Sequence, residues 1–347
     1  MTFERPLLEV DDLHVSFPIR QGLFQRTAGE VRAVNGVSFK VRRGTSFGLV
    51  GESGCGKTTV ARAVLRLVEP SDGAILFDNK DVSRMDAAAM QQFRGRVQAV
   101  FQDPFSSLNP RMSIGRIIGE PIRVHGLKPD SEVRSEVLRL LDICGLPARF
   151  ADLYPHEMSG GQRQRVGIAR ALAMNPELIV CDEAVSALDV SIQAQIINLL
   201  EELQKELGLT YLFIGHDLSV VRHICDDVAV MYLGRIAETA PSDELFANPK
   251  HPYTKALIDA VPNPNPDLEA DRVIEPLQGE VPSPANLPSG CLFHPRCPIA
   301  TTRCRQEAPG LENVAPAHAA ACWEAGAPQQ AAVTSSPNKT TTQGVAP

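Results

Sequence analysis

Residues 49–59, "LVGESGCGKTT", contain the phosphate-loop pattern G-x-x-x-x-G-K-T. An apolar run, "SFGLV" at residues 46–50, ends inside this stretch and predicts a strand. A helix is predicted after it, marked by Val60, Val64 and Leu67 on one face. A strand, a glycine-rich loop and a helix in this order form a site for nucleotide phosphates. The stretch therefore predicts an α/β fold built around a nucleotide.

The loop supplies each group that a triphosphate needs. Gly51, Gly54 and Gly56 allow a tight turn whose backbone N–H groups converge on phosphate oxygens. Lys57 is expected to reach the β and γ phosphates, and the Thr58 hydroxyl is expected to bind Mg²⁺. The other expected members of the ATP site in this stretch are Ser53, Cys55 and Thr59.

A second group of polar residues follows other apolar runs. Asp182 ends "LIVCD" and is expected to complete the Mg²⁺ shell, together with Thr58 and Gln102. The next residue, Glu183, is the candidate general base for the attacking water. Gln102 and His216 each stand just past an apolar run, where side chains line the cleft of an open sheet. Both are expected to sense the γ-phosphate or its water.

The stretch "MSGGQRQR", residues 158–165, opens another predicted helix. Ser159 and Gln162 form the capping-box pattern, so an ordinary helix start is one interpretation. Gly160 and Gly161 also leave backbone N–H groups open at the positive end of that helix, where an anion can bind. The phosphate loop opens a different helix, so the source of this anion is an open question at this point.

Composition places limits on the class of protein. The chain has 347 residues, 44% of them hydrophobic, enough for one large domain with an appendage. Its formal net charge of -7 argues against broad binding to nucleic acid. We find no run of about 20 apolar residues and no signal peptide at the start, so the chain is expected to stay in the cytosol.

Four regions follow from composition and periodicity. The first, residues 1–240, is the nucleotide-binding domain, with a helical subdomain at about 105–175. Proline-rich sequence predicts a linker or arm at 241–290. A cysteine-rich segment at 291–323 and a disordered tail at 324–347 complete the chain.

Together these motifs resemble the ATP-binding subunits of ABC transporters. The phosphate loop, Gln102, "MSGGQ", "LIVCDE", "SALD" and His216 occur in that family's order. The resemblance implies a P-loop NTPase fold of ABC type with a mixed sheet, in which two chains face each other head to tail. The "MSGGQ" of one chain would then close over the γ-phosphate of the other. Asp189 would lie at the dimer seam, Phe17 would stack on adenine unless it is a core residue, and Val34 would meet the adenine edge.

Within that family the chain is similar to dipeptide and oligopeptide import subunits, on stretches such as "HPYTKALIDAVPNPNP". This implies an ATPase at the cytoplasmic face of the membrane with two transmembrane permease subunits, a second ATPase subunit and, indirectly, an external solute-binding protein. Residues 101–121 would dock on the permease. Importers of nickel or glutathione, a soluble ABC ATPase acting on nucleic acid or ribosomes, and a sensor module that uses ATP only to assemble remain alternatives.

Four cysteines crowd the C-terminal end. In a reducing compartment such a group indicates a metal, either a [4Fe–4S] cluster or tetrahedral zinc. The absence of a C-x-x-C pair weakens a zinc ribbon, while His294 and His318 leave a mixed zinc site open. Similarity to the segment appended to peptide-importer ATPases implies the iron–sulfur cluster. The expected ligands are Cys291, Cys297, Cys304 and Cys322.

Overall fold

Two β-sheets form the core of the protein. The computed structural model describes residues 5–21, 26–103, 107–262, 277 and 279–325. The larger sheet has the strand order β11-β12-β10-β9-β3-β8-β7-β6. Strands β6 to β9 and β3 run parallel, whereas β10, β12 and β11 add antiparallel strands to one edge, so the predicted mixed sheet is confirmed. In sheet order the strands are β11 (Glu312–Ala315), β12 (His318–Ala320), β10 (Arg235–Pro241), β9 (Asp227–Tyr232), β3 (Ser46–Val50), β8 (Thr210–Gly215), β7 (Leu178–Asp182) and β6 (Val97–Phe101).

The smaller sheet is antiparallel and was not predicted. Its order is β2-β1-β4-β5, with β1 (Pro6–Gln21), β2 (Arg26–Arg42), β4 (Asp72–Phe77) and β5 (Lys80–Asp81). In β1 the pairing register shifts between Val10 and Leu13, around the left-handed Asp12. This irregularity breaks the alternation of apolar residues, which is the signal for such a strand.

The parallel strands are buried on both faces. In β7, Leu178 and Val180 pack into a cluster with the smaller sheet and α1 (Lys57–Val64). Ile179 and Cys181 pack on the other face, in a cluster with the helical subdomain. Burial on both faces explains why these strands read as unbroken apolar runs rather than as alternating ones.

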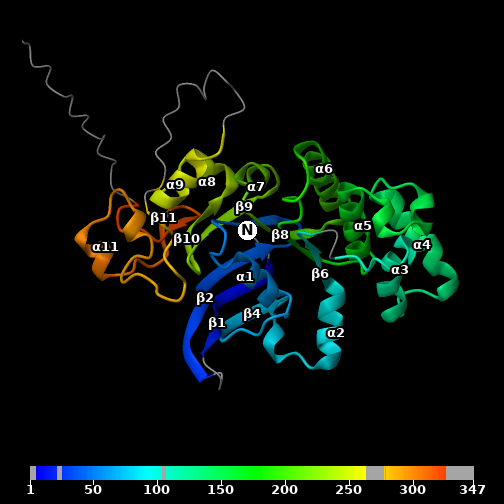
Figure 1. Cartoon of the computed structure of the whole chain (residues 1–347), viewed down its shortest axis with the longest axis horizontal. Helices are drawn as coiled ribbons and strands as arrows, with labels where there is room; N and C mark the ends of the chain where they lie inside the picture. The colour runs from blue at the N-terminus through cyan, green and yellow to red at the C-terminus, as the bar shows by residue number, and fades with distance from the viewer. Residues whose placement is uncertain (1–4, 22–25, 104–106, 263–276, 278, 326–347) are drawn as a thin grey trace, which may run out of the picture.

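The helical subdomain lies at one end of the molecule (Figure 1). It contains α3 (Ile114–Val124), α4 (Asp130–Ile143) and α5 (Gly160–Leu172), inside the predicted limits of about 105–175. The other helices of the nucleotide-binding region are α2 (Ala87–Arg96), α6 (Val190–Leu207) and α7 (Leu218–Ile224). The helix predicted to include Leu67 is shorter, because α1 ends at Val64 and Leu67 is exposed.

The region predicted as a proline-rich linker is partly helical. Residues 242–259 carry α8 (Ser242–Ala247) and α9 (Pro252–Asp259), so the prediction of an irregular linker from residue 241 is wrong there. Proline fits the first turn of a helix because the N–H that it lacks has no partner there, and Pro252 begins α9 in this way. Residues 263–276 and 278, and 326–347 of the predicted tail, lie outside the described residues.

The cysteine-rich segment joins the main sheet instead of forming a separate unit. It carries β11, β12, the single turn η4 (His294–Arg296) and α11 (Thr302–Gln306). Strand β12 pairs with β10, and the segment lies at the opposite end from the helical subdomain (Figure 1). In the described part of the chain, no helix combines the length and apolar character needed to cross a membrane.

Candidate active site

The phosphate loop is wedged between β2 and β9. Gly51 has φ 149°, and a Cβ there would lie 2.1 Å from the carbonyl oxygen of Met231. Gly56 has φ 108°, and a Cβ there would lie 2.2 Å from the carbonyl oxygen of Ala33. Glycine is required at both positions by conformation and by space.

The ammonium group of Lys57 lies inside the phosphate loop. The side chain is buried, and Nζ donates to the carbonyl oxygens of Gly51 at 2.8 Å and Glu52 at 2.9 Å. Phosphate oxygens are acceptors of the same kind, so the ammonium can exchange these bonds for a nucleotide. Burial raises the pKa of the neighbouring Cys55 thiol, which fits an inert member of the loop.

The hydroxyl and the carboxylate that the sequence assigns to Mg²⁺ lie within hydrogen-bond distance of each other. Thr58 Oγ1 donates to Asp182 Oδ1 at 3.3 Å. Asp182 is 8% exposed, and burial raises the pKa of its carboxyl group while the Thr58 hydrogen bond lowers it. Two hard oxygen ligands facing each other fit Mg²⁺, which would supply positive charge opposite the phosphates.

Glu183 stands at the carboxyl end of β7 beside His216. The atoms Glu183 Oε1 and His216 Nδ1 are 3.5 Å apart, and the His216 side chain is the more exposed. Glu183 has the uncommon φ of 50°, and its N–H donates to the carbonyl oxygen of Ile214 at 2.8 Å. Such left-handed backbone is uncommon in a non-glycine residue.

The sheet register brings Gln102 to the same edge. Phe101 in β6 pairs with Asp182 in β7, so Gln102 follows β6 where Glu183 follows β7. Gln102 is exposed at this edge. Leu108, in the stretch expected to dock on the permease, is buried in the core, so its side chain cannot lie on a docking surface.

The helix start at "MSGGQ" contains the predicted capping box. Gln162 N–H donates to Ser159 Oγ at 3.4 Å, and Ser159 N–H donates to Gln162 Oε1 at 2.9 Å. The two glycines differ: a Cβ on Gly161 would lie 2.3 Å from Ile192 Cγ2 in α6, but one on Gly160 would meet Leu188 Cδ2 at an ordinary 3.4 Å. Gly161 is therefore needed for helix packing, and Gly160 leaves the helix start open.

Residues assigned to the dimer seam and the adenine differ in exposure. Asp189 caps α6, accepting the Ile192 N–H at 3.0 Å. Phe17 is 41% exposed on β1, which rules out the core interpretation. Val34 is 1% exposed in the core, so the interpretation of its side chain as an adenine contact is wrong.

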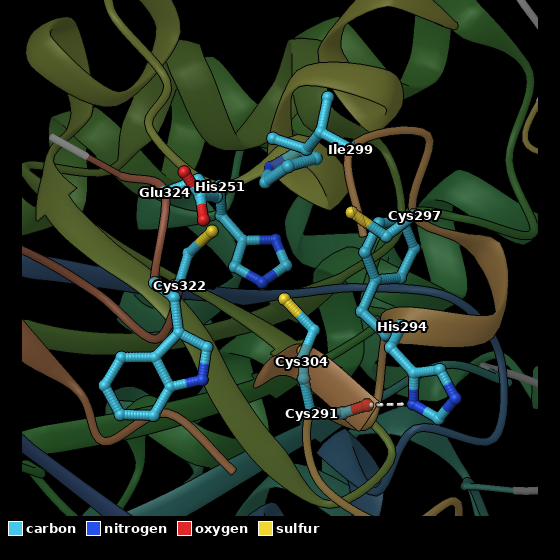
Figure 2. A pocket seen from close by; sticks show the side chains of 11 residues that line it. His251, Cys291, His294, Cys297, Ile299, Cys304, Cys322 and Glu324 are labelled. Atoms are coloured by element: carbon cyan, nitrogen blue, oxygen red, sulfur yellow. Dashed lines mark hydrogen bonds between the residues drawn. The ribbon is translucent and has the colours of Figure 1, made fainter. Parts of the chain in front are cut away.

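The four C-terminal cysteines line one small pocket (Figure 2). His251 lines it too, a residue that the sequence gave no reason to include. Burial lowers the pKa of His251 to about 4, so the imidazole is neutral at pH 7. His294 lines the pocket but its Nδ1 is bonded to the carbonyl oxygen of Cys291 at 2.9 Å. The cysteines are Cys291, Cys297, Cys304 and Cys322.

A single-ion site is not supported. His318 lies away from the pocket, fully buried, with Nε2 2.6 Å from Glu238 Oε1, so a zinc site that includes it is wrong. Over the described residues, no three or more His, Cys, Asp and Glu side chains are grouped so that they could hold a metal ion. The described residues thus contain no metal-ion site that would support the predicted binding of metal by this segment.

Comparison with known proteins agrees with these motifs. The family model "ABC transporter" matches residues 34–186, and the model "Oligopeptide/dipeptide transporter, C-terminal region" matches residues 237–304. The oligopeptide transport ATP-binding protein AppF of Bacillus subtilis is 53% identical, over 92% of this chain and 97% of AppF. The chain belongs to the ATP-binding subunits of the oligopeptide/dipeptide ABC transporter family. The same type of subunit from Salmonella typhimurium, OppF, is 52% identical over 88% of this chain and 93% of its own.

Solved structures carry the same cassette as this ABC ATPase. The protein cbiO1 from Clostridium perfringens, part of the transporter complex cbiONQ, is 31% identical with a TM-score of 0.61, over 71% of this chain and 92% of its own. The ATP-binding cassette MJ0796, in a dimeric post-hydrolysis state with ADP and Pi, is 27% identical with a TM-score of 0.60, over 68% of this chain and 98% of its own. The shared cassette thus covers about two thirds of this ABC ATPase and more than nine tenths of each of these two chains.

Proposed function

We propose that this ATPase powers the uptake of dipeptides and oligopeptides, as a peripheral subunit on the cytoplasmic face of a membrane permease. One observation carries the proposal: a complete phosphate site and a peptide-transporter C-terminal region occur in one chain. Relatives named for oligopeptide transport support peptides over nickel or glutathione as the solute. They also disfavour a soluble ATPase acting on nucleic acid or ribosomes.

The working unit in this proposal is a head-to-tail pair of ATPase subunits, identical or related. ATP held by Lys57 and Thr58 of one subunit is completed by the helix start at Gly160 of the other. The open helix start at Gly160 and the dimeric state of the cassette MJ0796 support this arrangement. Two permease subunits and an external solute-binding protein complete the transporter. ATP binding closes the pair and hydrolysis releases it.

Reconstitution tests the solute. The chain, its permease subunits and the solute-binding protein are placed in liposomes, and ATP turnover is measured with a mixed peptide library, nickel or glutathione. We expect peptides to raise turnover at least several-fold over the level without solute, because solute drives subunit closure. Stimulation by nickel or glutathione alone would assign the subunit to another importer.

We further propose that the four cysteines hold a [4Fe–4S] cluster. Each thiolate of such a cluster binds a different iron, so the sulfurs need not surround one ion as they do around zinc. Four cysteines that line one pocket supply the number of thiolates that such a cluster needs. The free space is about 10 Å³, room for about one water molecule, so a cluster requires the cysteine loops to move apart. When bound, it would tie β12 to η4 as a structural staple.

Anaerobic purification tests the cluster. We expect a brown protein with broad visible absorption and about four irons and four sulfides per chain. Cys304→Ser removes one proposed ligand and should abolish the colour, whereas Cys144→Ala, a buried cysteine of the helical subdomain, should keep it. A colourless protein with one zinc per chain, or with neither metal, would contradict the cluster.

A further inference from the structure

The C-terminal region reaches the phosphate loop at Glu52. The N–H of Glu52 donates to Tyr253 Oη at 2.9 Å, and its carboxylate accepts both terminal nitrogens of Arg296, at 2.8 and 3.0 Å. Its carbonyl oxygen is one of the two that accept from the Lys57 ammonium group. One loop residue is therefore tied to α9 by its N–H, to η4 by its side chain and to the phosphate-binding lysine by its carbonyl.

The ion pair is sheltered from water. The Arg296 side chain is 7% exposed and that of Glu52 is 25% exposed. The guanidinium carbon lies 5.9 Å from the ring centroid of Tyr232, which in turn packs on Tyr253 with 4.7 Å between ring centroids. A bidentate arginine–carboxylate pair fixes both distance and orientation, and it is stronger where water is excluded. The aromatic wall therefore holds Arg296 against Glu52.

The negative charge of Glu52 makes its pairing with Arg296 important for ATP binding. Glu52 is the acidic residue of a loop that has to receive a triphosphate, and an unpaired carboxylate there repels phosphate oxygens. Arg296 neutralises that carboxylate from a side that is distant in the sequence, 244 residues away. The positive charge of Arg296 is stable in this role because Glu52 raises the pKa of the guanidinium group further.

We propose that Arg296 and Tyr253 are positioning residues of the ATP site, which hold Glu52 and the phosphate loop in the form that accepts ATP. Arg296 also cancels the repulsion between Glu52 and the phosphates. The proposal rests on the ATPase function proposed above and extends it, because it makes the C-terminal region a working part of the ATP site.

Kinetics of the full-length chain test this role. Arg296→Gln is expected to raise the KM for ATP, and the Kd of a fluorescent ATP analogue, by about 10-fold, with kcat within about twofold of wild type. Tyr253→Phe removes only the hydroxyl and is expected to raise KM by about threefold. The matched control is Arg305→Gln, an exposed arginine of the same segment, which should leave KM unchanged.

A second substitution separates positioning from folding. Glu52→Gln in the Arg296→Gln background removes the unpaired carboxylate, and it should return KM to within about threefold of wild type. A residue needed only for folding would not be rescued in this way, since the ion pair is still absent.

Two results would overturn the proposal while leaving the ATPase function intact. The first is an active wild type whose KM is unchanged by Arg296→Gln. The second is an Arg296→Gln variant whose kcat falls as its KM rises, together with a double variant whose KM does not return toward that of wild type. A wild type that binds and hydrolyses no ATP would instead contradict the ATPase function itself.

Discussion

Replacing Glu183 by Gln is expected to lower ATP turnover by about 10²- to 10⁴-fold while leaving ATP binding unchanged. The amide keeps the shape of the side chain at the end of β7 but cannot take a proton from the attacking water. Glu183 Oε1 lies 3.5 Å from His216 Nδ1, so the two side chains are close enough to act together. Steady-state turnover and binding of a fluorescent ATP analogue measure the two effects. Undiminished turnover would show that the general base is another residue.

The same variant tests the head-to-tail pair. A site that binds ATP but cannot cleave it should accumulate closed dimers, which light scattering detects. Adding Gly160→Ala should prevent this, because a methyl group then stands at the open helix start without disturbing its own chain. Gly161→Ala is the contrasting change, since its Cβ meets Ile192 Cγ2 at 2.3 Å and should lower stability by about 1–3 kcal/mol. Dimers that persist with Gly160→Ala would contradict the role of this helix start.

Replacing His318 by Ala is expected to destabilise the C-terminal region by about 3 kcal/mol. His318 and Glu238 are both fully buried, with Nε2 2.6 Å from Oε1. The remaining partners of the carboxylate are the backbone N–H groups of Lys250 at 2.6 Å and His251 at 2.9 Å. Without the imidazole, a buried carboxylate loses its side-chain partner and the joint between β10 and β12 loses its central contact.

Urea unfolding followed by tryptophan fluorescence measures this effect, because the only tryptophan of the chain, Trp323, lies in the C-terminal segment. Its indole N–H donates to the carbonyl oxygen of Glu307 at 3.2 Å, and the Arg303 guanidinium lies over its ring. The matched control is His223→Ala, which removes an exposed histidine paired with Glu201 at 3.4 Å and should change stability by at most about 1 kcal/mol. Equal stability of the His318→Ala variant and wild type would show that the buried pair does not hold β12.

The sequence alone predicted the elements whose signals are local. The phosphate loop, the strand runs of β3, β7 and β8 and the capping box at Ser159 each depend on residues within a few positions of one another. Helix α6 ends at Gly208, where the glycine has φ 65°, a helix end that a glycine after an apolar helical run indicates. Local geometry of this kind is set by backbone conformation and by the side-chain period, both of which can be read from the order of residues.

The features of the fold that depend on contacts between residues far apart in the sequence were visible only in the tertiary structure. Proline content indicated a linker after residue 240, but packing against the core makes part of that region helical and places Tyr253 on the phosphate loop. The pairing of Arg296 with Glu52 and of His318 with Glu238 has no local signal, because the partners are 244 and 80 residues apart. The phosphate-loop motif, and the resemblance of the motif order to a known family, thus indicated an ATP-binding subunit. Only the folded chain shows that its C-terminal region contacts Glu52 of the phosphate loop, because burial and ion pairing are properties of neighbours in space.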